Sequence, residues 1–194
     1  MGTNVHALEL TRSPHGVGKP DRAEVEAAVR TIIRWSGDNP ERDGLIETPA
    51  RVARALEEAF VGYGQDPAAV LRKSFDERGV RFESRCEHHL APIVGRAWVA
   101  YVPDGRVIGI SKLARVVEIY ARRLQLQERL TAQIANVIEQ VLKPRGVGVL
   151  VRATHHCMTA RGVHKPEADL VTSRMIGCLR DHSELRQEFL SMTV

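Results

Sequence analysis

Residues 113–142 read LARVVEIYARRLQLQERLTAQIANVIEQVL, and this stretch decides the fold class. Its apolar residues recur at helical spacing, so the pattern predicts one long helix over about this range. Lys143 and Pro144 follow directly and predict its end. The apolar side of this helix consists of Val116, Val117, Tyr120, Leu124, Leu130, Ile134, Val137, Ile138 and Val141.

Alternating and β-branched runs stand on both sides of the long helix and predict strands. The predicted strands are Val80–Ser84, Ile93–Val102, Val107–Ile110, Val147–Ala153 and Leu170–Cys178. Strands and helices do not alternate regularly along the chain. The order therefore predicts an α+β fold in which the strands pair antiparallel.

Two helices are expected ahead of the first strand. Asp21 and Glu24 resemble a capping box at the start of the first helix, which should end near Gly37. Thr48 and Pro49 predict the N-cap and the first helical position of the second. The predicted organisation is a flexible tail over 1–20, an N-terminal helical region over 21–65 and one main domain over 66–194.

The composition, with 43% hydrophobic and 27% charged residues, is typical of a soluble globular protein. No apolar run approaches the roughly 20 residues that cross a bilayer, and the first twenty residues lack a signal-peptide stretch. A cytoplasmic protein without membrane segments is therefore expected. The net charge of +4 and the pI near 9.2 favour an anionic partner, which could be nucleic acid, acidic lipid or a phosphorylated small molecule.

Two clusters of metal-binding side chains stand about seventy residues apart. Cys86 and His89 are three residues apart in the first, and Cys157 ends the second, HHC. An odd count of three cysteines favours metal binding or catalysis over a disulfide framework. Three protein ligands leave a fourth position for water, so this set predicts a catalytic zinc site. Taken singly, each residue could equally be a buried cysteine or a hydrogen-bonded histidine.

Strand alternation makes a further prediction about the second cluster. If a strand continues through it, His155 and Cys157 share one face and His156 points away. His155 rather than His156 is then expected near the metal.

A phosphate site is predicted where a strand passes into the long helix. Ser111 is the expected N-cap, and Lys112 and Arg115 lie on the first turn, where free N–H groups and the helix dipole favour an anion. The same residues could instead form a solvated basic face.

Other polar residues are ambiguous from pattern alone. Gln127 and Glu128 could bind the N–H donors of a guanine edge, or could be ordinary surface residues of a helix. Arg51 and Arg161 are further basic candidates.

Five segments, taken together and in order from about Glu47 to Leu190, resemble GTP cyclohydrolase I. They are ETPARVARALEEAF, SRCEHHLAPIVGRAWVAYVP, VIGISKLARVVEIYARRLQLQERLTAQIA, ATHHCMTARGV and TSRMIGCLRDHSELRQEFL. The resemblance implies a tunnelling fold and a homodecamer of two pentamers with active sites shared between subunits. It also implies that the guanine imidazole ring of GTP is opened, C8 leaves as formate and 7,8-dihydroneopterin triphosphate forms, the first step of pterin and folate synthesis.

The resemblance further implies a role for each matching residue. Cys86, His89 and Cys157 match the zinc ligands, while His88 and His155 match the histidines that handle protons. Glu128, with Gln127 beside it, matches the guanine anchor. The triphosphate and ribose pocket is matched by Ser111, Lys112, Arg115, Arg161 and Arg51.

The chain departs from the family between Leu71 and Cys86, where it is shorter, and at Arg85 beside the first ligand. Two alternatives remain beside the cyclohydrolase. A GTP-binding relative without activity would suit the shortened segment. A zinc-stabilised nucleic-acid-binding module would suit the basic charge, but the chain lacks CxxC pairs and has only 5% aromatic residues for base stacking.

Overall fold

The computed structural model describes residues 18–70, 79–105, 107–108 and 110–193. Its helices are α1 Arg22–Trp35, α2 Thr48–Phe60, α3 Pro67–Val70, α4 Ile110–Ala121, α5 Gln127–Leu142, α6 His156–Thr159, α7 Cys178–Asp181 and α8 Ser183–Ser191, with a 3-10 helix η1 at Val61–Gly64. Its strands are β1 Val80–Cys86, β2 Pro92–Val102, β3 Leu124–Gln125, β4 Gly146–His155 and β5 Asp169–Gly177. Most of the predicted tail, and the first half of the shortened segment, lie outside the described residues.

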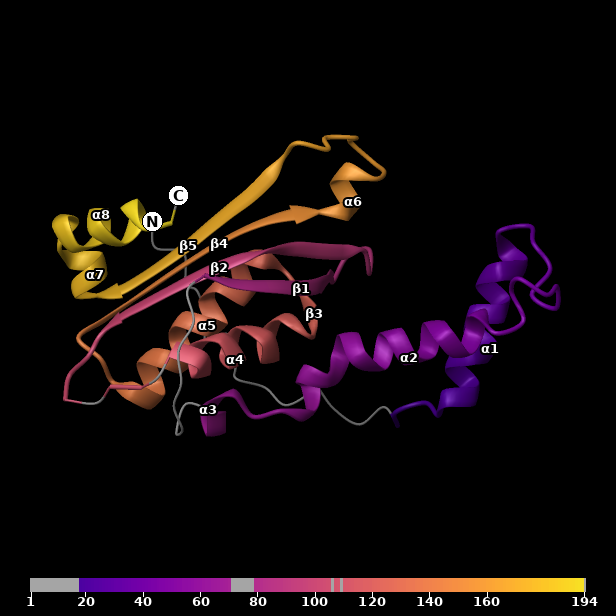
Figure 1. Ribbon diagram of the computed structural model, residues 1–194, viewed down its shortest axis with the longest axis horizontal. Coiled ribbons are helices and arrows are strands. Elements are labelled where there is room, and N and C mark those ends of the chain that lie inside the picture. Colours follow the sequence, from indigo (N-terminus) through magenta and orange to yellow (C-terminus); the bar gives the residue numbers. More distant parts are fainter. Residues whose placement is uncertain (1–17, 71–78, 106, 109, 194) are drawn as a thin grey trace, which may run out of the picture.

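The five strands form one sheet in the order β3-β1-β2-β4-β5. The pairs β1–β2, β2–β4 and β4–β5 are antiparallel, whereas β3 runs parallel to the end of β1. Helices α4 and α5 cover one face, and α7 and α8 lie on the other (Figure 1). The predicted combination of helices with an antiparallel sheet is confirmed, and the short parallel pairing was not predicted.

The main core lies between the sheet and the pair α4 and α5. Alternate side chains of β4, including Val147, Val149 and Val151, are fully buried against apolar residues of α5 such as Ile134 and Ile138. Each such burial stabilises the fold by about 1.5–3 kcal/mol. A smaller cluster fills the other face under α7 and α8 and consists of Leu150, Leu179 and Phe189.

The predicted single helix over 113–142 is wrong, because the chain leaves the helix after Ala121 and re-enters it at Gln127. Between these points Gln125 pairs with Cys86, and its buried side-chain amide donates to the carbonyl of Tyr120 at 2.7 Å. No glycine or proline marks this break in the sequence. Pairing with β1 therefore overrides a continuous helical pattern.

The predicted strand at Val107–Ile110 is also wrong. Val107 and Ile108 have no strand pairing, and Ile110 already begins α4. The Tyr101 hydroxyl accepts a hydrogen bond from the Ile108 N–H at 2.7 Å and donates to the Ile108 carbonyl at 3.2 Å. A side chain thus satisfies the backbone groups that a strand partner would otherwise take.

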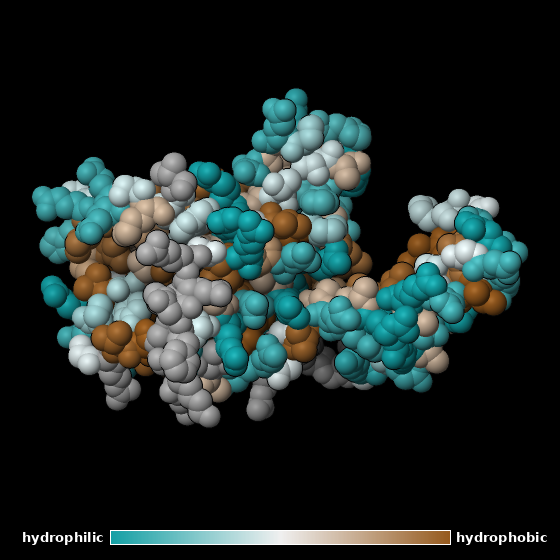
Figure 2. Space-filling view, in the orientation of Figure 1, coloured by the Kyte–Doolittle hydropathy of each residue, from teal (hydrophilic) through white to brown (hydrophobic). Residues whose placement is uncertain are grey.

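The start of α1 was predicted correctly. Asp21 and Glu24 form the capping box, with each side chain accepting from the other's backbone N–H at 2.9 Å. For α2 the prediction is one residue off, because Thr48 is already helical and Glu47 is the N-cap, with no side-chain cap. The apolar side chains Ile32 and Trp35 of α1 are 61% and 88% exposed, on the arm that α1 and α2 extend away from the sheet (Figures 1 and 2).

The N-terminal helices join the rest of the chain through η1. The Arg123 guanidinium donates to the Gly62 carbonyl at 2.9 Å and stacks on the ring of Tyr120, 5.0 Å from its centroid. A Cβ added to Gly62 would lie 2.1 Å from the carbonyl oxygen of Ile119, so only glycine permits this approach to α4. None of the helices in the described part of the chain is both long and apolar enough to cross a membrane.

Candidate metal centre

The turn after β1 brings two of the predicted ligands together. The N–H of Cys86 donates to Ala91 O, and the N–H of Leu90 donates to Cys86 O, both at 2.8 Å. This closes a tight turn that folds His89 back toward Cys86. Leu90 adopts a left-handed φ of 54°, which costs a non-glycine residue roughly 1–2 kcal/mol. The turn is therefore held against a local backbone penalty.

Cys157 reaches the same place from the end of β4. Strand β2 lies between β1 and β4, and Ile93 pairs with His155, so the C-terminal ends of β1 and β4 meet at one edge of the sheet. The prediction that Cys157 continues the strand is wrong, because β4 ends at His155 and Cys157 belongs to α6. This helical turn points the Cys157 thiol inward and leaves His156 exposed.

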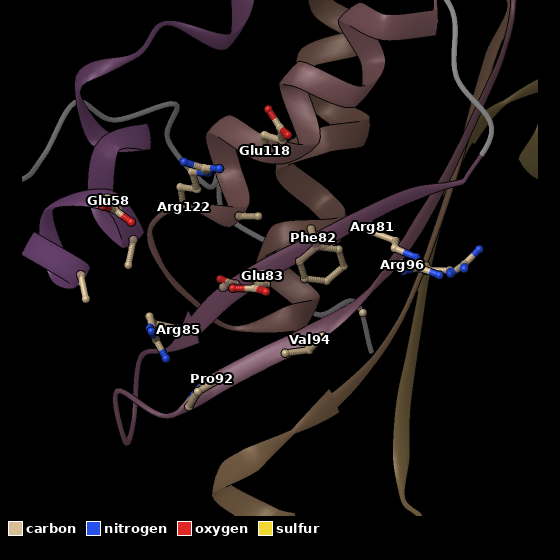
Figure 3. Close-up of a pocket in the computed structure, with 15 residues that line it drawn as sticks. Glu58, Arg81, Phe82, Glu83, Arg85, Pro92, Val94, Arg96, Glu118 and Arg122 are labelled. Atoms are coloured by element: carbon tan, nitrogen blue, oxygen red, sulfur yellow. The ribbon is translucent and has the colours of Figure 1, made fainter. Parts of the chain in front are cut away.

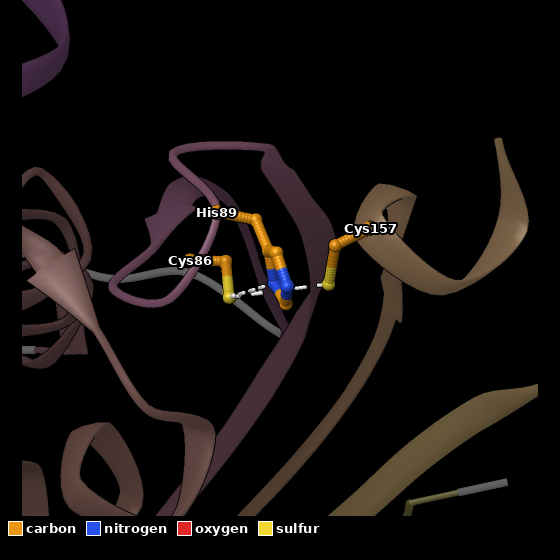
Figure 4. Close-up of side chains that lie close together, drawn as sticks. All are labelled: Cys86, His89 and Cys157. Atoms are coloured by element: carbon orange, nitrogen blue, oxygen red, sulfur yellow. Dashed lines mark hydrogen bonds between the residues drawn. The ribbon is translucent and has the colours of Figure 1, made fainter. Parts of the chain in front are cut away.

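The three side chains form a compact donor set (Figure 4). The Cys86 and Cys157 sulfurs are 3.9 Å apart, the Cys86 sulfur is 3.9 Å from His89 Nδ1, and the three donor atoms lie within 4.8 Å of one another. A tetrahedral ion about 2.3 Å from two sulfurs holds them about 3.8 Å apart. Both cysteines are buried whereas His89 is exposed. These residues could hold a metal ion that is open on the histidine side.

Electrostatics around Cys157 favour exchange of its proton for a cation. Burial raises the pKa of the Cys157 thiol above its ordinary value, and the neighbouring Cys86 raises this pKa further. The positive charge of Arg161 acts in the opposite direction, which indicates that this exposed guanidinium lies near the sulfur. Two adjacent thiols lose their mutual repulsion as thiolates only when a cation binds between them.

Gln127 orients His155 beside the metal centre. The Gln127 side chain is 1% exposed, and its Nε2 donates to the carbonyls of Leu170 at 2.8 Å and Val151 at 3.1 Å. Since these carbonyls identify the nitrogen, Gln127 Oε1 accepts from His155 Nε2 at 2.9 Å. Protein groups thus engage both ends of this amide. Gln127 was predicted as a base-binding residue, and the structure instead gives it a positioning role.

His155 is left with a free Nδ1. Because its Nε2 carries the proton, Nδ1 of the neutral ring holds the lone pair. Burial lowers the pKa of His155, and the charge of the exposed Glu128 nearby opposes this effect. His155 and Glu128 therefore belong to one electrostatic environment.

An ion pair that sequence reasoning missed fixes the metal-binding turn. Glu87, between the ligands Cys86 and His89, pairs with Arg129 of α5. Arg129 Nε also donates to Gln125 Oε1 at 3.4 Å, and the Glu87 N–H donates to Gln125 O at 3.0 Å. No spacing in the sequence connects Glu87 with Arg129, because both resemble surface charges and only the β1–β3 pairing joins them.

The predicted phosphate residues lie elsewhere in the chain. Helix α4 begins at Ile110, so Ser111 lies inside the first turn and is not the predicted N-cap. Lys112 is buried and Arg115 is exposed on the same turn. The far end of α4 approaches the metal centre, where the Ser84 hydroxyl donates to Arg123 O at 3.3 Å.

A helix of 12 residues is about 18 Å long, so the start of α4 is far from the donor set. Arg51 is also apart from it, exposed on α2 and paired with Glu47. One chain thus carries two separate parts of the predicted site.

The largest hollow among the described residues is not at the metal centre. A cavity of about 760 Å³ lies between α2, β1, β2 and α4 (Figure 3). Its charged lining includes Glu58, Glu83, Arg85, Glu118 and Arg122. It follows β1 beyond the short β3, where the strand has a free edge within the described chain.

Known proteins with similar sequences identify the family. The family model for GTP cyclohydrolase I matches residues 25–194. GTP cyclohydrolase 1 of Brucella anthropi is 49% identical over 91% of this chain and 87% of its own length, and that of Brucella abortus is 47% identical over 90% and 86%. A crystal structure of the apo archaeosine synthase QueF-Like covers 51% of this chain and 89% of that chain at 21% identity and a TM-score of 0.42, a likeness too weak to bear on function. The CEHH turn, the HHC cluster and the SKLAR helix start all fall within the matched range, and this chain belongs to the GTP cyclohydrolase I family.

Proposed function

We propose that this protein is a zinc-dependent GTP cyclohydrolase I, which opens the imidazole ring of GTP, releases C8 as formate and forms 7,8-dihydroneopterin triphosphate. The observation that carries the proposal is the donor set of Cys86, His89 and Cys157 in a chain that matches the family over nearly its whole length. Two thiolates and one imidazole suit zinc, which accepts sulfur and nitrogen ligands in tetrahedral geometry. Zinc with one open position supplies a nucleophile near neutral pH.

Residues of this chain account for the proton transfers. His155 begins each cycle neutral, with the Nδ1 lone pair free to accept a proton as purine C8 is attacked. The resulting imidazolium returns the proton to a purine or ribosyl nitrogen, which is the acid role expected from the resemblance. His88 is exposed and lies edge-on to His89, with ring centroids 6.1 Å apart, so a proton-shuttle role on the solvent side suits it.

Substrate recognition falls to charged groups around the centre. The exposed Glu128 carboxylate can accept two hydrogen bonds from the guanine edge, and its proximity to His155 would hold the base beside the proton acceptor. The triphosphate carries about four negative charges and suits Ser111, Lys112 and Arg115, with Arg161 and Arg51 as further donors. Since the first three lie at the other end of α4, the proposal requires them to come from a neighbouring subunit.

This requirement supports the tunnelling fold and the decamer of two pentamers expected from the resemblance. Most of β1 and the outer side of β5 have no strand partner among the described residues, so sheets of neighbouring subunits could join edge to edge. In this proposal residues 66–194 form the catalytic domain and residues 21–65 an appendage. GTP and the other subunits are the partners, with no role for nucleic acid or membrane. A reducing compartment such as the cytoplasm suits two metal-binding thiols.

Zinc-loaded protein incubated with GTP should release formate and a pterin that fluoresces after oxidation. Cys157→Ser should lose both zinc and turnover, because one thiolate ligand is removed. Cys178→Ser is the matched control, since Cys178 is half-buried outside the donor set and should keep both. Zinc and full activity in Cys157→Ser would refute the ligand set. Intact GTP would refute the activity, and GTP binding without formate would identify an inactive relative.

A further inference from the structure

Three arginines cross the sheet side by side on the face opposite α4 and α5. Arg81 of β1 pairs in register with Arg96 of β2, and Arg96 pairs in register with Arg152 of β4. All three side chains are exposed, and we call them the arginine row. Their neighbours Phe82, Ala97 and Ala153 belong to the core under the helices, so strand alternation directs the row to the other face. The metal centre, with the core residue Cys86, lies on the helix-covered side.

The row places like charges directly opposite one another. Side chains paired across antiparallel strands have Cβ atoms about 4.5–5.5 Å apart, and like charges at this distance destabilise a sheet. In β4, every residue of which is described, Arg152 is the one exposed residue in an otherwise buried strand. A folded protein thus maintains a charge cluster where an apolar or neutral residue would be more stable.

No acidic side chain of the described residues forms an ion pair with Arg81, Arg96 or Arg152. The two nearest acids in the strand register are Glu83, two residues along β1, and Asp169, paired in register with Thr154. Asp169 accepts a hydrogen bond from the Thr154 hydroxyl at 2.6 Å. The charge of the row is therefore left for a group outside the described chain.

A hollow beside the row gives such a group space. A cavity of about 390 Å³ is lined by Arg96 and Arg152, with Trp98, Thr154 and Asp169 around them. The half-buried Trp98 packs against the cluster under α7 and α8 and so bounds one side. Arg81 and Arg96 extend together to the same side of β1 and β2 (Figure 3). The Asp169 carboxylate at the rim would repel an anion, so the favourable region is the arginine side.

We propose that the arginine row and its hollow bind a chain of linked phosphate groups, at a site separate from the metal centre. Adjacent strands lie about 4.8 Å apart, so the three guanidinium groups are spread over roughly 10 Å. One orthophosphate reaches one or two guanidinium groups, whereas a di- or triphosphate chain can form bidentate hydrogen bonds with successive arginines. The ligand class is therefore an inorganic polyphosphate or the phosphate chain of a nucleotide.

Calorimetric titration of the full-length zinc-loaded protein with inorganic tripolyphosphate tests this site. The test variant is Arg96→Gln/Arg152→Gln. The matched control is Arg34→Gln/Arg54→Gln, which removes two exposed arginines of α1 and α2 and has the same net charge, 4 − 2 = +2. We expect wild type and control to bind one more equivalent per chain than the test variant, or at least ten-fold more tightly at this site, with affinity falling as salt rises.

Further arms separate the row from other causes. Arg96→Lys/Arg152→Lys keeps the charge but not the fork of donors, so it should bind more weakly than wild type and more tightly than the glutamine variant. Competition by ATP would assign the site to nucleotide phosphate chains, and lack of competition to free polyphosphate. GTP turnover by the glutamine variant, with no tripolyphosphate added, should equal that of wild type and shows that the protein is folded. Equal titrations of wild type and glutamine variant, equal weakening in the control, or equally tight orthophosphate binding would overturn the proposal.

Discussion

At the scale of single residues, the buried amide of Gln127 determines what His155 can do. Its nitrogen is held by two carbonyls, which directs its oxygen to His155 Nε2 and leaves Nδ1 free. The neighbouring Glu128 is exposed, although the two residues look alike as a polar pair in the sequence. Burial alone separates a positioning residue from one that is free to meet substrate.

Replacement of Gln127 by Leu should lower GTP turnover by about 10–100-fold while zinc content stays unchanged, because His155 loses the partner that orients it. Unpaired carbonyls should also destabilise the protein by about 1–3 kcal/mol. Metal analysis, denaturant unfolding and steady-state rates measure the three effects. Gln140→Leu, on the exposed side of α5, is the control and should leave turnover intact. Unchanged turnover in Gln127→Leu would contradict the positioning role.

Tyr120 gives a prediction about alkaline pH. Its side chain is 1% exposed, and burial raises its pKa to about 12. Above pH 10 the unfolded chain releases this proton while the folded protein keeps it, so stability falls as pH rises toward 12. The hydroxyl has no hydrogen-bond partner among the described residues, so Tyr120→Phe should be neutral or slightly stabilising at pH 7.

The difference in unfolding free energy between Tyr120→Phe and wild type should therefore grow in favour of phenylalanine between about pH 9 and 12. Other titrating groups are common to both proteins and cancel in this difference. Denaturant unfolding at several pH values measures it, and a constant difference would show that the phenol is not shielded from solvent.

At the scale of elements, two residues of β3 organise the metal centre. Their pairing with the end of β1 interrupts the helix, gives Glu87 a backbone partner and brings α5 close enough for Arg129 to reach the metal-binding turn. The turn contains Leu90 in a left-handed conformation, so it benefits from an external clamp. The ion pair is partly exposed, and its value lies in fixing geometry rather than in net stability.

Removal of this clamp by Arg129→Gln should weaken zinc affinity by about 10–100-fold, because the turn no longer presents Cys86 and His89 in fixed positions. Competition with a chromophoric chelator measures the affinity. Arg122→Gln, an exposed arginine with no ion pair to a described residue, should bind zinc like wild type. The charge swap Glu87→Arg/Arg129→Glu should recover part of the loss. Wild-type affinity in Arg129→Gln would exclude the clamp.

At the scale of the whole molecule, the predicted site is divided. The donor set lies where β1 and β4 end, whereas Ser111, Lys112 and Arg115 follow the far end of β2. The 11-residue strand β2 spans about 36 Å between these regions. A folded single chain therefore cannot bring its own phosphate residues to its own metal, and only an assembly can complete the site.

Subunits that lack different halves of the site should complement one another. Arg115→Glu removes a phosphate donor and Cys157→Ser removes a ligand, so each homo-oligomer should have little activity. Random co-assembly in equal amounts should restore roughly a quarter of wild-type turnover, because each intact half is present with a chance of about one in two. A mixture of the double variant with Cys157→Ser supplies no intact metal half and serves as control. No recovery after verified co-assembly would place the whole site within one chain.

Local pattern was enough for much of this protein. Apolar periodicity located most of the helices and strands, the Asp21 and Glu24 capping box located the start of α1, and Cys/His spacing identified all three members of the donor set. These features depend on neighbours within a few residues, which the sequence displays directly. Strand alternation failed for Cys157 because the chain turns helical at His156, and the Val107–Ile110 prediction failed because a tyrosine side chain took the place of a strand partner.

The tertiary structure decided everything that depends on which strands lie side by side. Register placed Gln125 against Cys86 and so divided one helical pattern into two helices, and it aligned Arg81, Arg96 and Arg152, which the sequence scatters over seventy residues. It also brought Arg129 to Glu87 and separated the phosphate residues from the metal. The sequence by itself therefore determined the residue types and local conformations of the site. Long-range pairing, whose free energy comes from burying whole faces rather than from any single neighbour, decided which residues meet.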